Sequence, residues 1–571
     1  MRHYIWIIIL MYCALAGCTD NNNLYKDESI GNSNIAGSEN NNNNTENNEN
    51  NNTGGGSSSV ENNGANNNNG VDNNGHTNNN GSGNGNIDGD ISGGENSNSG
   101  KPEQKLNNTL SLGSNSIDMK DESKQLHTLI YNLPEQPTDD YSTSSSITIS
   151  GQNISNIPSA KVLQYKPSLY NSLNENHDEH YHKDKELMDH ISNFNNFVDK
   201  KGIKPIKKNP YIMQKVPSGI QVGTVWSNVY VLNNDSYKTI SAKCIAVSAH
   251  AYFFLDTKAG NISDEQLQLI VDSFDKDYAI VHEKFGIESD IDNNGKVIFL
   301  ITDLADRVMG FFYSADKYKN SQLGGRYKSN EADILYVNYK YFAKNMWEQY
   351  KTDVLATFIH EFQHMTLFDT RVRENLSPSI SVWINEGLSM IAEYYGGYTA
   401  PHKNYIASFL QDHQGFTLIE NSSGLDYGYS LLFTRYLQER FGDGFIKKIY
   451  SSKYTGVDAV SEAVDTNFNT LFQEFANMVM LTGRNITNDP RYNIEAFNYA
   501  QGTPEYNING FNLAEIIDET YSRNKHNNLF ITTKGYSSVF MPYSIRLTAW
   551  TGVFYNIDLS GDNAKGFYAV Y

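Results

Sequence analysis

The stretch that decides the fold runs from residue 353 to residue 368 and reads DVLATFIHEFQHMTLF, with His360 and His364 four residues apart. An α-helix turns about 100° per residue, so side chains at positions i and i+4 lie one above the other on the same face. Two imidazoles at that spacing can bind one zinc ion. Glu361 points to the side of this pair, where its carboxylate can take a proton from water beside the metal. The pattern predicts a zinc helix with His360 and His364 as ligands and Glu361 as general base.

A catalytic zinc ion needs a third protein ligand, and a second motif supplies a candidate. Residues 383–393 read WINEGLSMIAE and are predicted to begin another helix after the turn at Pro378. Glu386, near the start of that helix, can reach the metal from the facing side. The alternative is an acid that only interacts with the helix dipole. Glu393 lies two turns further on and can accept the outer N–H of a zinc histidine.

Together, HEFQH and WINEGLSMIAE resemble the gluzincin clan of zinc metallopeptidases, and within it the hyicolysin-type peptidase family. The resemblance covers about residues 216–490 and includes DIDNNGKVIFLI at 290–301 and YGYSLLFTRYLQERFG at 427–442. It implies an α+β fold, thermolysin-like, with a mixed sheet in one lobe and helices in the other. It also implies one Zn²⁺ per chain on the two histidines and Glu386, Glu361 as general base, and a protein or peptide substrate.

The zinc motifs also differ from those of other zinc peptidase families, and these differences help to predict the type of peptidase. Twenty-one residues separate the second histidine from Glu386, more than in the gluzincin aminopeptidases, and their G-x-M-E-N segment is absent. Both differences favour an endopeptidase. Met390 stands where thermolysin-like enzymes have an Asp, so either Glu393 or Asp369 is expected to orient a zinc histidine. Asp426 is the alternative third ligand.

The group that stabilises the tetrahedral intermediate is the least determined part of the site. Members of the clan often use a downstream Tyr or His for this hydrogen bond. Tyr427, which opens YGYSLLF, is our candidate, and ordinary packing is the alternative in a chain with 38 tyrosines.

Strand-like segments surround the zinc motifs. Residues 222–232, 242–256 and 332–338 are predicted strands, the last at the sheet edge, and Ser263 is a predicted N-cap for a helix that ends near Gly286. A small all-β module is expected at the C-terminus, over residues 491–571, where polar and apolar residues alternate.

A candidate calcium loop precedes one of these strands. Asp290, Asp292 and Asn294 form the pattern DxDxNG, the first half of a calcium loop. The twelfth residue of an EF-hand loop is a Glu that binds calcium, whereas the twelfth residue counted from Asp290 is Ile301. This difference excludes an EF-hand. Ca²⁺ binding near these residues would therefore need carboxylates from elsewhere in the chain, and a polar turn that feeds the strand is the alternative.

The N-terminal part reads as a lipoprotein leader followed by a tether. Residues 1–17 resemble a bacterial signal peptide that ends in Leu15-Ala16-Gly17 before Cys18, the residue expected to carry lipid. Residues 18–115 form a predicted disordered linker, since positions 21–100 contain 30 Asn and 15 Gly. Residues 116–215 are a polar pre-region with one predicted helix over 179–200. We expect an extracytoplasmic, membrane-anchored bacterial lipoprotein, with the cell surface as one location.

Charge and composition exclude one class of function and leave others open. The formal net charge of −20 argues against binding to nucleic acid, which needs clustered Lys and Arg. The alternative to a peptidase is a surface adhesin or binding lipoprotein on a zincin scaffold. The intact Glu361 argues against it, because a degenerate site tends to lose the base first. A zinc hydrolase acting on other substrates also remains open.

Overall fold

The protein is described by a computed structural model. It describes residues 109–119, 126–153, 178–208, 215–306, 308–400, 402–411, 417–419, 427–484, 486–497, 502–503, 508–509, 512–526, 536–550 and 554–570. The predicted signal peptide, most of the linker and Cys18 lie outside these ranges. None of the helices within them has both the length and the hydropathy to span a bilayer.

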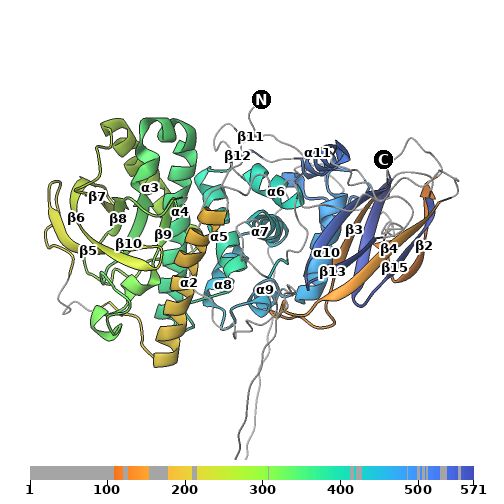
Figure 1. Cartoon of the computed structure of the whole chain (residues 1–571), viewed down its shortest axis with the longest axis horizontal. Coiled ribbons are helices and arrows are strands. Elements are labelled where there is room, and N and C mark those ends of the chain that lie inside the picture. Colours follow the sequence, from red (N-terminus) through yellow and green to blue (C-terminus); the bar gives the residue numbers. More distant parts are fainter. Residues whose placement is uncertain are drawn as a thin grey trace, which may run out of the picture. The chain divides into compact units, whose positions relative to one another are not determined.

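A mixed six-stranded sheet lies beside the zinc motifs (Figure 1). Its order is β5-β6-β7-β8-β10-β9; β7, β8 and β10 run parallel, and the other neighbours are antiparallel. All residues of β8 and β10 are buried, which agrees with their continuous apolar sequences. The strands are β5 (Val225–Asn233), β6 (Ser236–Val247), β7 (Ala251–Asp256), β8 (Val297–Thr302), β9 (Gly310–Phe312) and β10 (Ile334–Asn338).

The edge strand is a different one from the strand that the sequence suggested. Residues 332–338 contain β10, but β10 pairs with β8 on one side and with β9 on the other, so it is internal. The three-residue strand β9 forms the edge beside the zinc motifs. The prediction was wrong because a strand of three residues, Gly310–Phe312, is too short to give an alternating pattern.

The helices follow the predicted pattern. Helix α3 (Asp264–Lys284) has the predicted N-cap at Ser263, completed as a capping box by Gln266. Helix α2 (Asp178–Lys201) matches the helix predicted in the pre-region. The other helices are α4 (Lys344–Arg373), α5 (Val382–Gly396), α6 (His402–Gln411), α7 (Tyr427–Phe441), α8 (Gly444–Ser451), α9 (Val457–Val464), α10 (Phe468–Leu481) and α11 (Leu513–His526). Short elements complete the list: η2 (Ser314–Lys317), η3 (Asn320–Gln322), η4 (Tyr339–Phe342), η5 (Glu495–Phe497), β11 (Gly502–Thr503) and β12 (Ile508–Asn509).

An aromatic layer joins the sheet to α3 and α4. Phe299 of β8 lies 4.6 Å, between ring centroids, from both Phe274 of α3 and Phe358 of α4. Phe362 of α4 lies 5.3 Å from Phe274 on the same basis. These rings are buried, so they keep water away from one side of the helix that carries His360 and His364.

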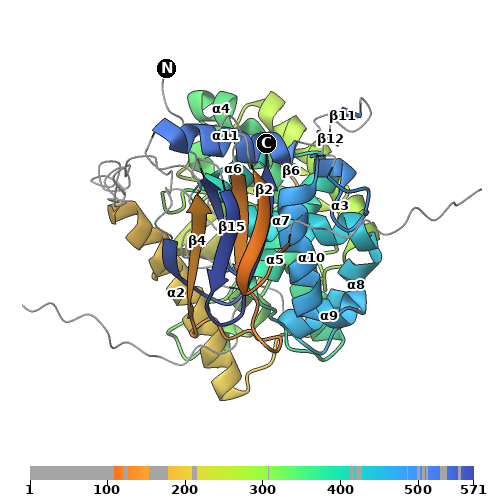
Figure 2. The ribbon, with the colours of Figure 1, turned by 90° about the vertical axis from the view of Figure 1, so that its right-hand side faces the viewer.

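Two four-stranded sheets combine strands from both ends of the described chain. One has the order β1-β16-β3-β14 and the other β13-β4-β15-β2, so early and late strands alternate, as Figure 2 shows for β4, β15 and β2. The strands are β1 (Thr109–Leu110), β2 (Gly113–Met119), β3 (Leu126–Asn132), β4 (Ser145–Asn153), β13 (Tyr536–Phe540), β14 (Ile545–Trp550), β15 (Phe554–Ser560) and β16 (Ala564–Val570).

This pairing alters the expected domain boundaries. The all-β module expected within residues 491–571 obtains half of its strands from residues 109–153, which we had assigned to the linker and the pre-region. Local sequence could not reveal this, because antiparallel partners such as β3 and β16 are far apart along the chain. Tyr131 of β3 donates a hydrogen bond to Asn477 of α10 (3.3 Å), so this sheet packs on the helices.

Candidate metal centre

Helices α4 and α5 position the residues predicted to bind the metal. From Val354 to Val372, α4 is buried throughout, so the imidazoles of His360 and His364 lie inside the protein. Helix α5 packs closely on α7 through Gly387, where a Cβ atom would lie only 2.3 Å from a side-chain carbon of Thr434. This close packing against α7 therefore fixes the position of the helix that carries Glu386.

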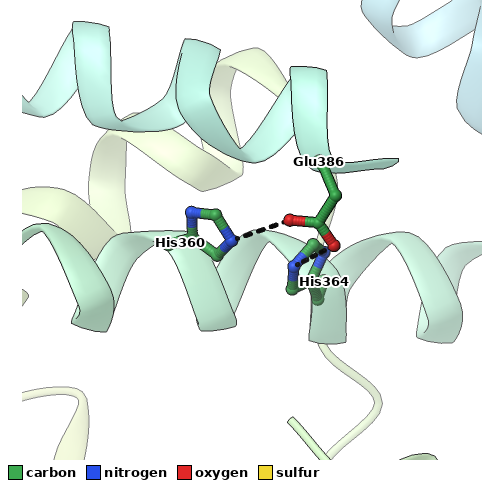
Figure 3. Close-up of side chains that lie close together, drawn as sticks. All are labelled: His360, His364 and Glu386. Atoms are coloured by element: carbon green, nitrogen blue, oxygen red, sulfur yellow. Dashed lines mark hydrogen bonds and ion pairs between the residues drawn. The ribbon is translucent and has the colours of Figure 1, made fainter. Parts of the chain in front are cut away.

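Figure 3 shows Glu386 directed from α5 toward the two histidines of α4. Its Oε2 atom lies 3.2 Å from Nε2 of His360, and its Oε1 atom lies 3.6 Å from Nε2 of His364. The metal-ligating atoms of the three residues all lie within 4.8 Å of one another, and all three side chains are buried. The structure therefore brings the predicted ligand set together.

The donor set fits a zinc ion. In a tetrahedral site with bonds of about 2.0–2.2 Å, neighbouring ligand atoms are about 3.3–3.6 Å apart. The distances from the Glu386 carboxylate oxygens to Nε2 of His360 (3.2 Å) and to Nε2 of His364 (3.6 Å) fall at or near this range. Glu386 Oε1 is also buried without a hydrogen-bond partner in the described part of the chain, which is costly unless a cation binds there.

His360 is oriented by a buried carboxylate. Its Nδ1 atom lies 2.6 Å from Oε1 of Glu393, which leaves Nε2 directed toward Glu386. A carboxylate only accepts hydrogen bonds, so Nδ1 carries the proton and the Nε2 lone pair is available to a metal. Of the two candidates for this role, Glu393 contacts the histidine. Asp369 instead forms an ion pair with Lys317 (2.7 Å) and accepts a hydrogen bond from the Ser289 amide (2.9 Å).

Glu361 lies beside the ligand set and is held by the sheet. Its Oε2 atom accepts a hydrogen bond of 2.9 Å from the backbone amide of Phe312, in edge strand β9. Burial, assisted by the negative charge of Glu386, raises the pKa of Glu361 to about 8. This pKa is that of the metal-free protein, and a cation bound by the neighbouring residues would lower it and favour the carboxylate form.

Burial and charge also shift the pKa values of two of the candidate ligands in the metal-free protein. Burial raises the pKa of Glu386 to about 7. For His360, burial lowers the pKa, but hydrogen bonds to Glu386 and Glu393 outweigh it and place the pKa well above its ordinary value. A cation would therefore compete with protons for these groups, so metal binding is expected to depend on pH.

Two further candidate residues, Tyr427 and Asp426, are neighbours in the sequence where α7 begins. Tyr427 is the first residue of α7 and is buried. Asp426, the alternative third ligand, is among residues 420–426, which lie outside the described ranges. Helix α7 packs on α5, where Thr434 donates a hydrogen bond of 3.1 Å to the carbonyl of Gly387. The role of Tyr427 stays a prediction.

Sequence reasoning missed three groups at the site. His402 contacts Glu393, Ser389 Oγ lies 3.1 Å from Nε2 of His360, and the Phe312 amide contacts Glu361. A serine one turn after Glu386 could have been noticed from helical spacing. No local pattern marks His402 or Phe312, because each comes from an element that meets the site only in the folded chain.

A second group of acidic residues lies near the predicted calcium loop. Carboxylate oxygens of Asp290, Asp292 and Asp333 lie within 4.8 Å of one another, and Asp333 comes from the segment before β10. Two lysines already neutralise part of this charge: Lys208 contacts Asp290 at 2.7 Å, and Lys317 contacts Asp333.

Comparison with known proteins identifies a related metalloprotease. No protein-family model matches the chain. The chain is 29% identical over 221 residues to the neutral metalloprotease ShpI of Staphylococcus hyicus, an alignment that covers 36% of this chain and 49% of the relative. The chain therefore spans about half the length of that protein. This similarity supports a metallopeptidase relationship and agrees with the resemblance deduced from the motifs.

Proposed function

We propose that the protein is a zinc-dependent metalloendopeptidase that acts outside the cytoplasm. The observation that carries the proposal is the buried group of His360, His364 and Glu386 on two facing helices, with Glu361 beside it. Similarity to a neutral metalloprotease supports the metalloprotease part of this proposal. His360, His364 and Glu386 would hold one zinc ion, which would supply a Lewis acid that acidifies water and polarises the scissile carbonyl.

In this mechanism the protein side chains carry the proton and hold the ligands. The carboxylate of Glu361 takes a proton from the attacking water and then passes it to the leaving amine. The Phe312 amide fixes Oε2 of Glu361, which leaves Oε1 as the oxygen that would accept the proton. Glu393 holds His360 in the tautomer whose Nε2 atom is free to bind metal. Tyr427 remains our candidate donor to the tetrahedral intermediate.

We place the substrate along β9, the edge strand next to Glu361. β9 pairs with β10 on one side only, so its other side is the end of the described sheet. An extended peptide can add to such an edge through main-chain hydrogen bonds, which are independent of the side chains. Because the Phe312 amide contacts Glu361, a peptide bound along β9 would lie next to the general base and would present a carbonyl to the metal group.

The location and the anchor belong to the same proposal. The sequence before Cys18 supports a lipid-anchored bacterial lipoprotein.

Asp290, Asp292 and Asp333 support a structural Ca²⁺ that would reduce the repulsion among their carboxylates. Calcium should then raise the melting temperature of the parent protein but not that of Asp292→Asn, whereas equal melting temperatures in calcium and in chelator would contradict this site.

Proteolysis of denatured casein tests the main proposal. The soluble chain from residue 104 onward retains the strands of the six-stranded sheet and of both four-stranded sheets. It should cleave casein, lose activity in a chelator and recover it with zinc. Cleavage that a chelator leaves unchanged would exclude metal catalysis. Bound zinc without cleavage of casein or of a broad peptide library would favour the alternative, a surface binding or adhesin lipoprotein on the same scaffold.

A further inference from the structure

The carboxylate of Glu393 lies between two buried histidines. Its Oε1 atom is 2.6 Å from Nδ1 of His360, and its Oε2 atom is 3.0 Å from Nε2 of His402. Glu393 and His402 are 6% and 4% exposed, so water has little access to either group. The second histidine therefore satisfies an oxygen that would otherwise be buried without a donor.

His402 is held in place by its helix. It is the first residue of α6, and its backbone amide donates a hydrogen bond of 3.0 Å to the carbonyl of Thr399. Helix α6 packs closely against α7, because a Cβ atom on Gly428 would lie only 2.2 Å from the Tyr405 carbonyl oxygen. The His402 imidazole thus contacts the Glu393 oxygen that His360 does not, from a helix that packs closely on α7.

We propose that His402 is a positioning residue of the metal centre: by donating from Nε2 to Glu393 Oε2, it holds Oε1 against His360 and so directs His360 Nε2 to the metal. The inference rests on the proposed zinc site and adds a residue to it. A carboxylate with both oxygens fixed cannot rotate about its terminal bond, so the histidine that it contacts keeps one orientation. Partners behind a metal ligand typically contribute 10–100-fold to metal affinity.

The opposing explanation is that His402 only fills space at the start of α6. The two explanations differ in what a donor-preserving substitution does. His402→Gln places an amide N–H where Nε2 lies, whereas His402→Phe keeps a planar ring, somewhat larger than imidazole, but removes the donor. Ile406→Val, one turn further along α6 and fully buried, is a matched packing control.

Zinc affinity measured by competition with a chromogenic chelator tests the inference without reference to activity. We expect His402→Phe to weaken zinc binding about 10–100-fold. We expect His402→Gln to remain within about threefold of the parent, and Ile406→Val to bind zinc as the parent does. Circular dichroism and melting temperature of the metal-free variants establish that each is folded. Equal affinities for His402→Phe and the parent would overturn the inference.

A double-mutant cycle tests whether His402 acts through Glu393. If it does, His402→Phe should cause no further loss of affinity when added to Glu393→Ala. A full additional loss would show that His402 acts by another route and would overturn the inference, even if zinc binding by the parent is normal. Failure of the parent to bind zinc would instead overturn the proposed function together with the inference. If Glu393→Ala does not fold, the contrast between His402→Gln and His402→Phe decides.

Discussion

Replacing Glu361 by Gln should abolish most of the activity while leaving the metal centre intact. The side chain is buried and is positioned by the Phe312 amide, which donates to Oε2 over 2.9 Å. The carboxamide oxygen of Gln can accept the same hydrogen bond, so the size and position of the side chain are preserved. What it loses is the ability to accept the proton of water. General-base catalysis contributes about 10²–10⁴-fold, so cleavage should fall at least about a hundredfold, or about 2.7 kcal/mol in the activation free energy.

The assay compares initial rates on a quenched fluorescent peptide, with zinc content measured on the same samples. Glu348→Gln is the matched control, because it makes the same change on the same helix at an exposed position. This control should retain parent activity. Loss of zinc in Glu361→Gln would mean that Glu361 is a ligand. Unchanged cleavage by a fully zinc-loaded Glu361→Gln would refute its role as general base.

Four further predictions address the ligands, the packing, the pH dependence and the anchor. Glu386→Ala should lose most of its zinc by elemental analysis, because two imidazoles alone bind the ion weakly; full retention would point to another third ligand. Gly310→Ala should destabilise the fold by about 1–3 kcal/mol in chemical denaturation, since the added methyl group would lie 2.4 Å from a side-chain carbon of α4 and 2.7 Å from a backbone oxygen. Gly444→Ala, which meets no atom within 4 Å, is its control. Burial raises the pKa of Asp277 from 3.8 to about 7, so the folded state keeps a proton that the unfolded state releases, and stability falls as pH rises between these values. Asp277→Asn should therefore stabilise the protein by up to about 4 kcal/mol at pH 8 and by little at pH 4, and equal effects at the two pH values would contradict this. Cys18→Ser should abolish labelling by a palmitate analogue, and equal labelling of variant and parent would exclude lipidation at this residue.

The sequence by itself predicted the elements whose patterns are local. The i, i+4 spacing of His360 and His364 requires only a helix, and α4 supplies it. The Ser263 cap and the apolar β8 strand were equally recognisable, because capping and burial leave marks within a few residues. Glu386 was also predicted as the third candidate ligand, but its approach to the histidines depends on how α5 packs against α4, which spacing alone does not fix.

Tertiary structure alone decided the contacts between segments far apart in the chain. Asp333 joins Asp290 and Asp292, His402 completes the hydrogen bonds of Glu393, and the short strand β9 displaces β10 from the sheet edge. The β-sheets likewise pair residues 109–153 with residues 536–570. The physical reason is common to all of these contacts. A hydrogen bond or ion pair between distant residues imposes no periodicity on either local sequence, so it appears only when packing of the whole chain brings the partners together.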